Sequence, residues 1–431
     1  MKSLSKLCDA GDWFDPEFDR IVRTELEEQP RLHRKQWEFA QIFRALRTLG
    51  LLRADARGLS MGGGVERLLY ALARRVRHLT VTDLYESASG WEGARTDDPD
   101  RFVKASAPFP IDHSRVSARR MDMRALEFAD GTFDFCYSSC ALEHIGTYDD
   151  FLTHLREVRR VLKDDGVYVL TTEFHYGDDI IPVPNNYYFS SGFLAELIGT
   201  ASLEAVGGGD SSLWPHALNT PLPSNLSDLC AHPANGITDR LLASTPHVQL
   251  LTGGLPFTSL SVVLTKAASG ASTGILPMAG LEETRRFIEA GVRSWKAFVE
   301  RTRFDLDPFG LFRNRPTRET PRLATLGGDD TLFHTGYVWL GCRARSITVE
   351  LDTWPADAGN AEIEIRVHRQ PVRCPDVVSC DAQVAVAVRG REHLRVNLSL
   401  ATDEACSYAV LGKLTAGACW ASGVSVQVSG G

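Results

Sequence analysis

Three consecutive glycines, Gly62, Gly63 and Gly64, stand between a short apolar run and a segment with helical periodicity. Glycine lets a ligand lie against bare backbone, and the free N–H groups at a helix start favour an anionic ligand group. Asp83 closes the next apolar run, where a carboxylate can accept hydrogen bonds from both hydroxyls of a ribose. The pattern predicts a site for a cofactor that contains a nucleoside.

The glycine spacing disfavours a nicotinamide dinucleotide as that cofactor. The dinucleotide fingerprint G-x-G-x-x-G needs a third glycine, and counted from Gly62 this position is Arg67. We therefore expect a different nucleoside cofactor.

The elements that must position this turn follow an α/β pattern. A chain of 431 residues is too long for one ordinary domain. Residues 1–50 are helical and amphipathic, and we expect them to form a cap or lid. Strand-like and helix-like runs alternate over residues 51–267, which is typical of a parallel sheet covered by helices. Residues 268–321 indicate a linker followed by one helix.

The pattern changes to a period of two in residues 322–431. Five segments alternate apolar and polar residues, so each should bury one face, as in an antiparallel β-sandwich. They are ITVEL from Ile347, EIEIRV from Glu362, QVAVAV from Gln383, HLRVNLSL from His393 and VSVQV from Val424. We expect a separate all-β module.

Two later segments suggest a family for the α/β part. They are ALEFADGTFDFCYSSCALEHI, residues 125–145, and LREVRRVLKDDGVYVLTTEF, residues 155–174. Their order and separation resemble the class I S-adenosylmethionine-dependent methyltransferases, most closely the small-molecule type 11 group, over residues 50–175 and more loosely to residue 267. The resemblance implies a Rossmann-like, mostly parallel seven-stranded sheet that binds S-adenosyl-L-methionine.

The resemblance also implies which residues contact this cofactor. The glycines would lie against its methionine portion and Asp83 at its ribose, while Asp122 would accept a hydrogen bond from the adenine amino group. Ser138, at the end of the fourth strand, would face the cofactor. The full set is Gly62, Gly63, Gly64, Glu66, Asp83, Leu84, Asp122, Met123 and Ser138. For Met123, ordinary core packing is an equal alternative.

The chain departs from the family pattern at two positions. Ser60 stands where the family often has an acidic residue, and Glu66 replaces the third glycine of G-x-G-x-G. The Glu66 carboxylate either hydrogen-bonds the ammonium of the methionine portion or favours the helix N-terminus electrostatically.

Methyl transfer to a hydroxyl requires removal of a proton, and histidine has a suitable pKa for a general base. His144 and His175 follow the fourth and fifth strands, at the carboxyl ends where α/β proteins bind ligands. The alternatives are a structural or cofactor-side role for His144 and an exposed loop position for His175.

Two other mechanisms are disfavoured by the sequence. Metal-assisted transfer has Asp178 and Asp179 available, but a catechol-type enzyme would place an aspartate after the fourth strand, where this chain reads Ser138-Ser139-Cys140. We expect no metal. Cys136 or Cys140 as a nucleophile lacks an activating motif, and strand cysteines are usually buried.

Three insertions are candidates for acceptor recognition. Residues 31–40 suit a lid over the cofactor, residues 87–114 form an unusually long connection, and residues 180–250 carry several aromatic side chains. These aromatics either stack on sugar rings or planar groups, or anchor the loops. They include Trp91, Phe102, Phe109, Tyr187, Tyr188, Phe189 and Trp214, with His216 beside them.

Composition limits the partners. The net charge of -8, without a dense Lys/Arg run, argues against nucleic acid. The sequence has no signal peptide and no apolar run long enough to span a membrane, so we expect a cytoplasmic location. Nine cysteines without a C-x-x-C pair fit reduced thiols.

The leading hypothesis is O-methylation of a sugar hydroxyl on a glycan or glycosylated metabolite, with the β module binding the acceptor or joining copies of the chain into a homo-oligomer. It rests on a loose likeness of the glycine-turn region to methyltransferases linked with surface polysaccharide. The alternatives are methylation of an aromatic or lipid-like natural product, and a non-catalytic scaffold whose sandwich binds glycan or protein.

Overall fold

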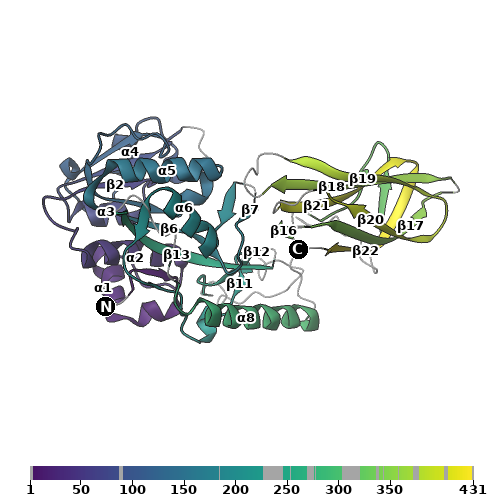
Figure 1. The fold of residues 1–431 in the computed structure, drawn as a ribbon, viewed down its shortest axis with the longest axis horizontal. Coiled ribbons are helices and arrows are strands. Elements are labelled where there is room, and N and C mark those ends of the chain that lie inside the picture. Colours follow the sequence, from purple (N-terminus) through teal and green to yellow (C-terminus); the bar gives the residue numbers. More distant parts are fainter. Residues whose placement is uncertain are drawn as a thin grey trace. The chain divides into compact units, whose positions relative to one another are not determined.

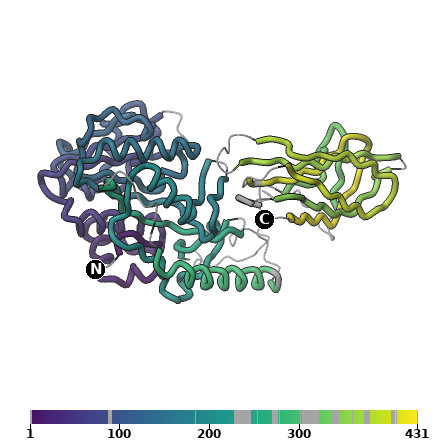
Figure 2. Tube along the Cα trace, in the orientation of Figure 1, coloured from purple at the N-terminus to yellow at the C-terminus, as the bar shows by residue number. Residues whose placement is uncertain are grey.

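The computed structural model forms two compact units (Figures 1 and 2). One spans residues 1–178, 187–231 and 237–304, and the other residues 179–186, 232–236 and 305–431. The structure describes residues 3–86, 91–183, 185–226, 246–252, 254–268, 276, 278–302, 321–335, 339–342, 344–357, 359–371, 378–401 and 406–429.

The first unit is built on one large sheet, which contains eleven strands among the described residues. Its main path runs through β10 (Gly209–Asp210), β1 (Ser5–Leu7), β13 (Leu255–Lys266), β6 (Leu162–His175), β5 (Phe133–Ser139), β2 (Arg57–Met61), β3 (His78–Asp83) and β4 (Val116–Arg120). The short strands β9 (Leu203–Ala205), β11 (Leu222–Pro223) and β12 (Leu250–Thr252) join beside β13.

The strands from β4 to β6 are parallel, and β13 is antiparallel to β6. All of β5 is buried, as expected for a central parallel strand covered on both faces. This arrangement confirms the predicted Rossmann-like fold. The sheet extends beyond the seven expected strands because β1 and β10 continue it past β13.

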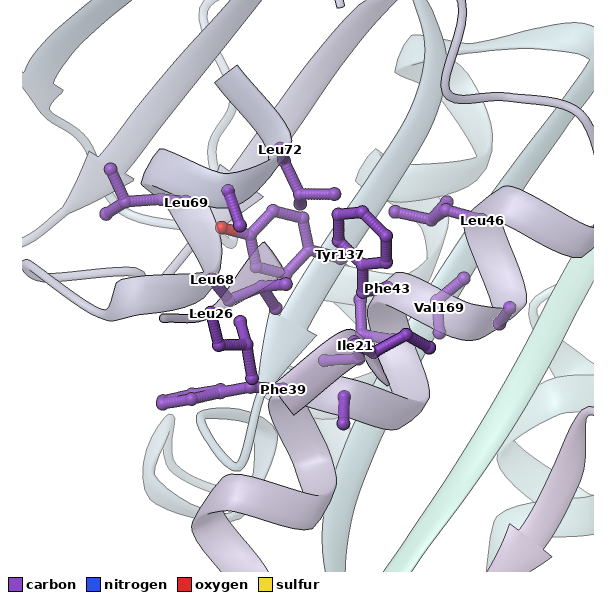
Figure 3. Close-up of a cluster of buried hydrophobic side chains, with 14 of the residues drawn as sticks. Ile21, Leu26, Phe39, Phe43, Leu46, Leu68, Leu69, Leu72, Tyr137 and Val169 are labelled. Atoms are coloured by element: carbon purple, nitrogen blue, oxygen red, sulfur yellow. The ribbon is translucent and has the colours of Figure 1, made fainter. Parts of the chain in front are cut away.

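The N-terminal segment therefore contributes a strand to the sheet as well as helices. It comprises β1, the 3-10 helix η1 (Ala10–Phe14), α1 (Pro16–Arg20), the π-helix η2 (Ile21–Glu25) and α2 (Arg34–Thr48). In the cluster drawn in Figure 3, apolar residues of α2, among them Phe39, Phe43 and Leu46, lie with Leu68 and Leu72 of α3 (Arg67–Ala73). Burial of this apolar stripe fixes α2 against the helix that follows the glycine turn.

The remaining helices and short elements of this part of the chain connect the strands. They are η3 (Glu92–Ala94), α4 (Pro99–Ala105), η4 (His113–Arg115), η5 (Leu142–His144), α5 (Tyr148–Val161), β7 (Ile181–Val183), β8 (Asn186–Tyr188), α6 (Ser191–Thr200) and η6 (Ala217–Asn219). No helix among the described residues is long and apolar enough to cross a membrane.

A helix outside the expected α/β boundary also belongs to the first unit. α8 (Leu281–Thr302) lies where the sequence predicts a helix, and the Thr284 hydroxyl donates to the Ser211 carbonyl at 2.7 Å. Ile288 is buried, and Trp295 packs against Leu226. These contacts attach α8 to the first unit.

The second unit contains two antiparallel sheets, which confirms the predicted all-β class of this region. One sheet runs β14 (Arg322–Thr325), β22 (Ala418–Ser429), β17 (Ser346–Pro355) and β20 (Glu392–Ser399). The other runs β15 (Thr331–His334), β21 (Cys406–Ala416), β18 (Ala361–Pro371) and β19 (Ser379–Val388), with β16 (Trp339–Cys342) beside β21. Alternate residues of β17 and β18, such as Val349 and Ile365, form its core.

Candidate functional site

The glycine turn joins β2 to α3 and leaves no room for side chains. Gly62 and Gly64 have positive φ angles of 62° and 44°. A Cβ atom on Gly62 would lie 2.6 Å from the Cβ of Ala141, and one on Gly63 would lie 2.1 Å from the Oγ of Ser60. Only glycine fits here without displacement, so the backbone of the turn stays bare.

Asp83 holds the turn in shape from the end of β3. Its Oδ2 accepts a hydrogen bond from the Gly64 N–H at 3.0 Å, and its Oδ1 accepts one from the Leu84 N–H at 2.7 Å. Burial raises the pKa of Asp83, although these hydrogen bonds oppose the shift. The neighbouring Leu84 side chain is 53% exposed, so the strand end presents a carboxylate beside an open apolar surface.

Glu66 lies at the N-cap of α3, directly after the turn. Its Oε1 is 3.9 Å from the Nζ of Lys35, and its buried Oε2 has no hydrogen-bond partner among the described residues. Burial raises the pKa of Glu66 to about 8; the Lys35 charge opposes this shift, while Glu38 and Asp83 add to it. The site therefore holds an unsatisfied carboxyl group, which is costly without a ligand.

Lys35 reaches this position from α2. Its Nζ lies 2.8 Å from the Glu38 Oε2 and donates to the Ser139 carbonyl, at the end of β5, at 3.3 Å. Burial alone would lower the pKa of Lys35, but the Glu38 carboxylate outweighs it, so the pKa is raised and the ammonium stays charged. The lid segment proposed from the sequence thus supplies a cation at the glycine turn.

Glu38 organises a buried group of charges that sequence analysis did not identify. Its carboxylate accepts from the Ser259 hydroxyl at 2.5 Å and from Ser139 at 3.2 Å, and its pKa is lowered to about 2, because Lys35 and Arg34 outweigh the effect of burial. Arg34 also pairs with Glu173 at the end of β6. The sequence offers one signal for this group: Glu38 stands between the apolar residues Trp37 and Phe39. A charged residue on a buried helix needs a partner of opposite charge.

Ser138 and Met123 belong to an interior hydrogen-bond network. The Ser138 hydroxyl is 2.6 Å from the Tyr168 hydroxyl, which is 2.9 Å from the Nε2 of His154. The Nδ1 of His154 lies 3.1 Å from the Met123 carbonyl. Ser138 is fully buried, and its hydroxyl takes part in this network.

Asp122 is partly occupied by a neighbouring cation. Both of its carboxylate oxygens accept hydrogen bonds from Arg124, whose Nη1 also donates to Asp150 at 2.9 Å. The hydrogen bonds from Arg124 lower the pKa of Asp122. The carboxylate is thus ionised and fixed in orientation.

The two candidate histidines lie in different environments. His144, in η5, is exposed, and its ring centroid is 5.4 Å from that of Trp91, which is 68% exposed. His175 is buried at the end of β6, and its Nδ1 accepts from the Gly177 N–H at 3.0 Å. The alternative of an exposed loop position for His175 is therefore wrong, because the strand continues to this residue.

The sheet register also separates the histidines. Ser139, at the end of β5, pairs with Thr171 of β6, so His175 lies four residues further along that strand. At about 3.3 Å per residue this is roughly 13 Å beyond the end of β5. His144 follows β5, which lies directly beside β2, the strand before the glycine turn. β6, which ends at His175, lies one strand further from β2.

The groups considered for the two disfavoured mechanisms are an aspartate pair and two cysteines. Asp178 forms an ion pair with Arg285 of α8 at 2.9 Å. Burial raises the pKa of the Cys136 and Cys140 thiols well above the usual value. Within the described residues, no three His, Cys, Asp or Glu side chains gather in a way that could hold a metal ion.

Most aromatic residues of the insertions act as anchors. Tyr187, Tyr188 and Phe189 are buried, with Tyr187 and Phe189 packed around Phe151. Trp214 is partly exposed. Residues 87–90, at the start of the long connection, lie outside the described residues.

Comparison with known proteins identifies the class. The family model described as a methyltransferase domain matches residues 59–170. No curated protein matches the chain. Among solved structures, a candidate sarcosine dimethylglycine methyltransferase from Galdieria sulphuraria shares 15% identity, with 58% of this chain and 98% of that chain covered and a TM-score of 0.36.

A second similar structure is an S-adenosylmethionine-dependent methyltransferase from Clostridium acetobutylicum, with 12% identity, 59% of this chain and 98% of that chain covered, and a TM-score of 0.33. Likenesses of this degree add nothing to the assignment, which follows from the family match. Residues 59–170 are a methyltransferase domain. The chain therefore carries an S-adenosylmethionine-dependent methyltransferase domain, and S-adenosylmethionine is its cofactor.

The residues at the turn fit this cofactor. Gly62 and Gly63 present backbone without side chains at the turn, and the Oε2 of Glu66, which has no hydrogen-bond partner among the described residues, can accept from an ammonium group. Lys35 supplies the opposite charge for a carboxylate.

Proposed function

We propose that the protein transfers the methyl group of S-adenosylmethionine to a sugar hydroxyl of a glycan or a glycosylated metabolite. The cofactor supplies an electrophilic methyl group, so the protein chiefly positions two reactants and excludes water. One observation supports the proposed cofactor site. The Glu66 carboxyl group has an oxygen without a partner among the described residues, and it lies next to the Lys35 ammonium.

The α-amino-acid end of the cofactor carries one positive and one negative group. In our proposal Glu66 accepts hydrogen bonds from the ammonium, and Lys35 pairs with the carboxylate. Their separation of 3.9 Å lets one zwitterionic group contact both side chains. Since Glu66 has a pKa of about 8 in the free protein, binding an ammonium would ionise it and release a proton at pH 7.

The adenosine end is assigned to the ends of β3 and β4. Each carboxylate oxygen has two lone pairs, so Asp83 can accept from the ribose hydroxyls while it keeps its bonds to Gly64 and Leu84. Asp122 is assigned to the adenine amino group, which would share the carboxylate with the backbone N–H and the guanidinium of Arg124. The exposed Leu84 side chain offers an apolar surface to the adenosine.

The acceptor is assigned to the region of His144 and Trp91. An exposed imidazole near the end of β5 can remove the hydroxyl proton, and an indole ring 5.4 Å away can stack against a sugar ring. The buried His175 is a weaker candidate for the base because its Nδ1 already accepts from the Gly177 N–H.

A second acceptor class is favoured by the same surface. Trp91 is 68% exposed, so an aromatic or lipid-like molecule would also bury apolar area against its ring. Polar hydroxyl contacts are not needed for that class.

The test is an acceptor screen with methyl-labelled S-adenosylmethionine and the full chain. Free sugars, nucleotide sugars, oligosaccharides, phenols and long-chain alcohols are supplied separately. Label on a sugar hydroxyl supports the proposal, label confined to phenols or long-chain alcohols supports the second class, and label on a nitrogen would contradict both.

A further inference from the structure

Two large aromatic side chains project into solvent far along the chain from the methyltransferase motifs. Phe14 is 66% exposed and Trp214 is 39% exposed. Their ring centroids are 5.4 Å apart with an interplanar angle of 69°, and the exposed His216 ring stacks on Trp214 at 4.0 Å. Aromatic rings exposed together in this way are typical of binding surfaces.

Hydrogen bonds hold this pair in place. The backbone N–H of Trp214 donates to the Asp9 Oδ2 at 3.2 Å, and the backbone carbonyl of Trp214 accepts from the Asn219 Nδ2 at 2.9 Å. Asn219 is buried, donates to the Asp9 Oδ1 at 2.7 Å and accepts from the Ala10 N–H at 2.9 Å. The two segments are therefore tied to each other, and a ligand would find the rings already ordered.

The register places both segments at the ligand-binding edge of the sheet. β1 is antiparallel to β13, which is antiparallel to β6, so β1 runs parallel to β6. β10 is parallel to β1, and Phe14 and Trp214 follow these two strands. Both side chains thus follow carboxyl ends at the same edge as His144 and the glycine turn.

The distance along this edge suits an extended ligand. β1 and β2 are separated by β13, β6 and β5. At about 4.8 Å between neighbouring strands, β1 lies roughly 20 Å from β2, the strand that precedes the glycine turn, and β10 lies one strand further away. A ligand that reaches both positions must be a chain of several units.

The size and chemistry of the Phe14–Trp214 surface indicate which kind of ligand unit binds there. A stable protein interface buries about 800 Å² on each partner, whereas one aromatic side chain supplies about 150–250 Å² when fully buried. Two partly exposed rings match a single small ring. The indole and phenyl faces can pack against C–H groups, while the Oδ2 of Asp9 and the Nε2 of His216 beside them can hydrogen-bond hydroxyls.

We propose that Phe14 and Trp214 form a distal subsite that binds one sugar ring of an oligosaccharide whose other end is methylated. This rests on the sugar acceptor of the proposed function. The subsite would increase affinity for long acceptors and leave the cofactor and single sugars unaffected.

The experiment is a saturation-transfer NMR titration of the full chain, in the presence of S-adenosylhomocysteine, with cellohexaose, maltohexaose and mannohexaose. We expect binding of at least one of them, and a loss of about tenfold in affinity for Trp214→Ala and about threefold for Phe14→Ala. Leu326→Ala, which removes an apolar side chain that is 54% exposed in the second unit, serves as the control. Phe14→Ala should keep the wild-type melting temperature because its ring is mostly exposed.

Unchanged hexasaccharide affinity in both variants, or no binding by the wild type, overturns the subsite. Labelled methyl transfer to the same sugars separates this failure from failure of the proposed function. If the hexasaccharide is methylated with the same KM in the wild type and both variants, the subsite is refuted and the sugar acceptor of the proposed function stands. If label is found only on a non-sugar acceptor, both the subsite and the sugar acceptor are refuted.

Discussion

The Nζ of Lys35 in α2 lies 3.9 Å from the Oε1 of Glu66 at the start of α3. The pair joins the N-terminal segment to the glycine turn, next to the carboxyl end of β5. An ammonium beside a carboxyl group that a bound cation can ionise is complementary to a zwitterion, and S-adenosylmethionine carries one in its α-amino-acid end. The N-terminal helix therefore contributes directly to the proposed cofactor site.

Replacement of Glu66 by Gln should stabilise the free protein at alkaline pH. The pKa of Glu66 is about 8 in the folded protein against an ordinary 4.5, so between these values the folded state binds more protons than the unfolded state. Wild-type stability therefore falls as pH rises from about 4.5 to 8. The variant should gain at least about 1 kcal/mol over the wild type at pH 8 and nothing near pH 4.

Melting temperatures without cofactor, measured from pH 4 to 9, check this prediction. Glu127→Gln, at an exposed position, is the matched control. A Glu66→Gln profile that runs parallel to the wild type would show that the carboxyl is not protonated in the folded protein.

Replacement of Gly62 by Ala should weaken S-adenosylhomocysteine binding about tenfold or more. The new Cβ would lie 2.6 Å from the Cβ of Ala141 and must displace the turn. Gly131 has the same φ of 62° but open space around it, so Gly131→Ala introduces the same backbone strain, about 1 kcal/mol, without the collision. Calorimetry should show lost affinity in the Gly62 variant alone, and equal affinities would argue against contact between the turn and the cofactor.

His144→Ala should lower turnover by about 10²–10⁴-fold with little change in cofactor affinity, because a positioned base contributes on that scale. His175→Ala should instead lower the melting temperature, since it removes a buried ring that accepts from the Gly177 N–H. Turnover, cofactor affinity and melting temperature are measured for both. Wild-type turnover in His144→Ala would exclude this residue as the base.

A fragment of residues 1–304 should fold and bind S-adenosylhomocysteine, whereas a fragment of residues 1–267 should be less stable. The shorter fragment lacks α8, whose Ile288 is buried and whose Trp295 and Phe298 pack against Leu226. Loss of this packing should cost several kcal/mol. Urea unfolding compares the two, and equal stability would show that α8 is dispensable.

Local features of the site could be predicted from the sequence. Gly62 to Gly64 and Asp83 stand directly after apolar runs, and strand, turn and helix follow one another along the chain, so their contact in the fold requires no long-range information. The strands of the β module were predictable for the same reason, because alternation along one strand, as in β17, records its two faces.

Contacts between distant segments could not be predicted. Lys35 meets Ser139, and Glu38 meets Ser259, only because α2 packs across the strands that carry these residues. The direction of the Ser138 side chain depends on the pleat of a strand that is buried on both faces, where both directions are apolar. β1 is three residues long, too short to show a period.

The central claim is that Lys35 and Glu66 recognise the α-amino-acid end of the cofactor, and one pair of ligands tests it most directly. S-adenosylhomocysteine contains this end, while methylthioadenosine keeps the adenosine and the thioether but lacks it. Calorimetric titration of both into the wild type, Lys35→Met and Glu66→Gln gives the result, with Lys104→Met of α4 as control. We predict that each site variant loses about 10- to 100-fold in affinity for S-adenosylhomocysteine and keeps its affinity for methylthioadenosine. Equal losses for both ligands, or no loss for either, would contradict the account.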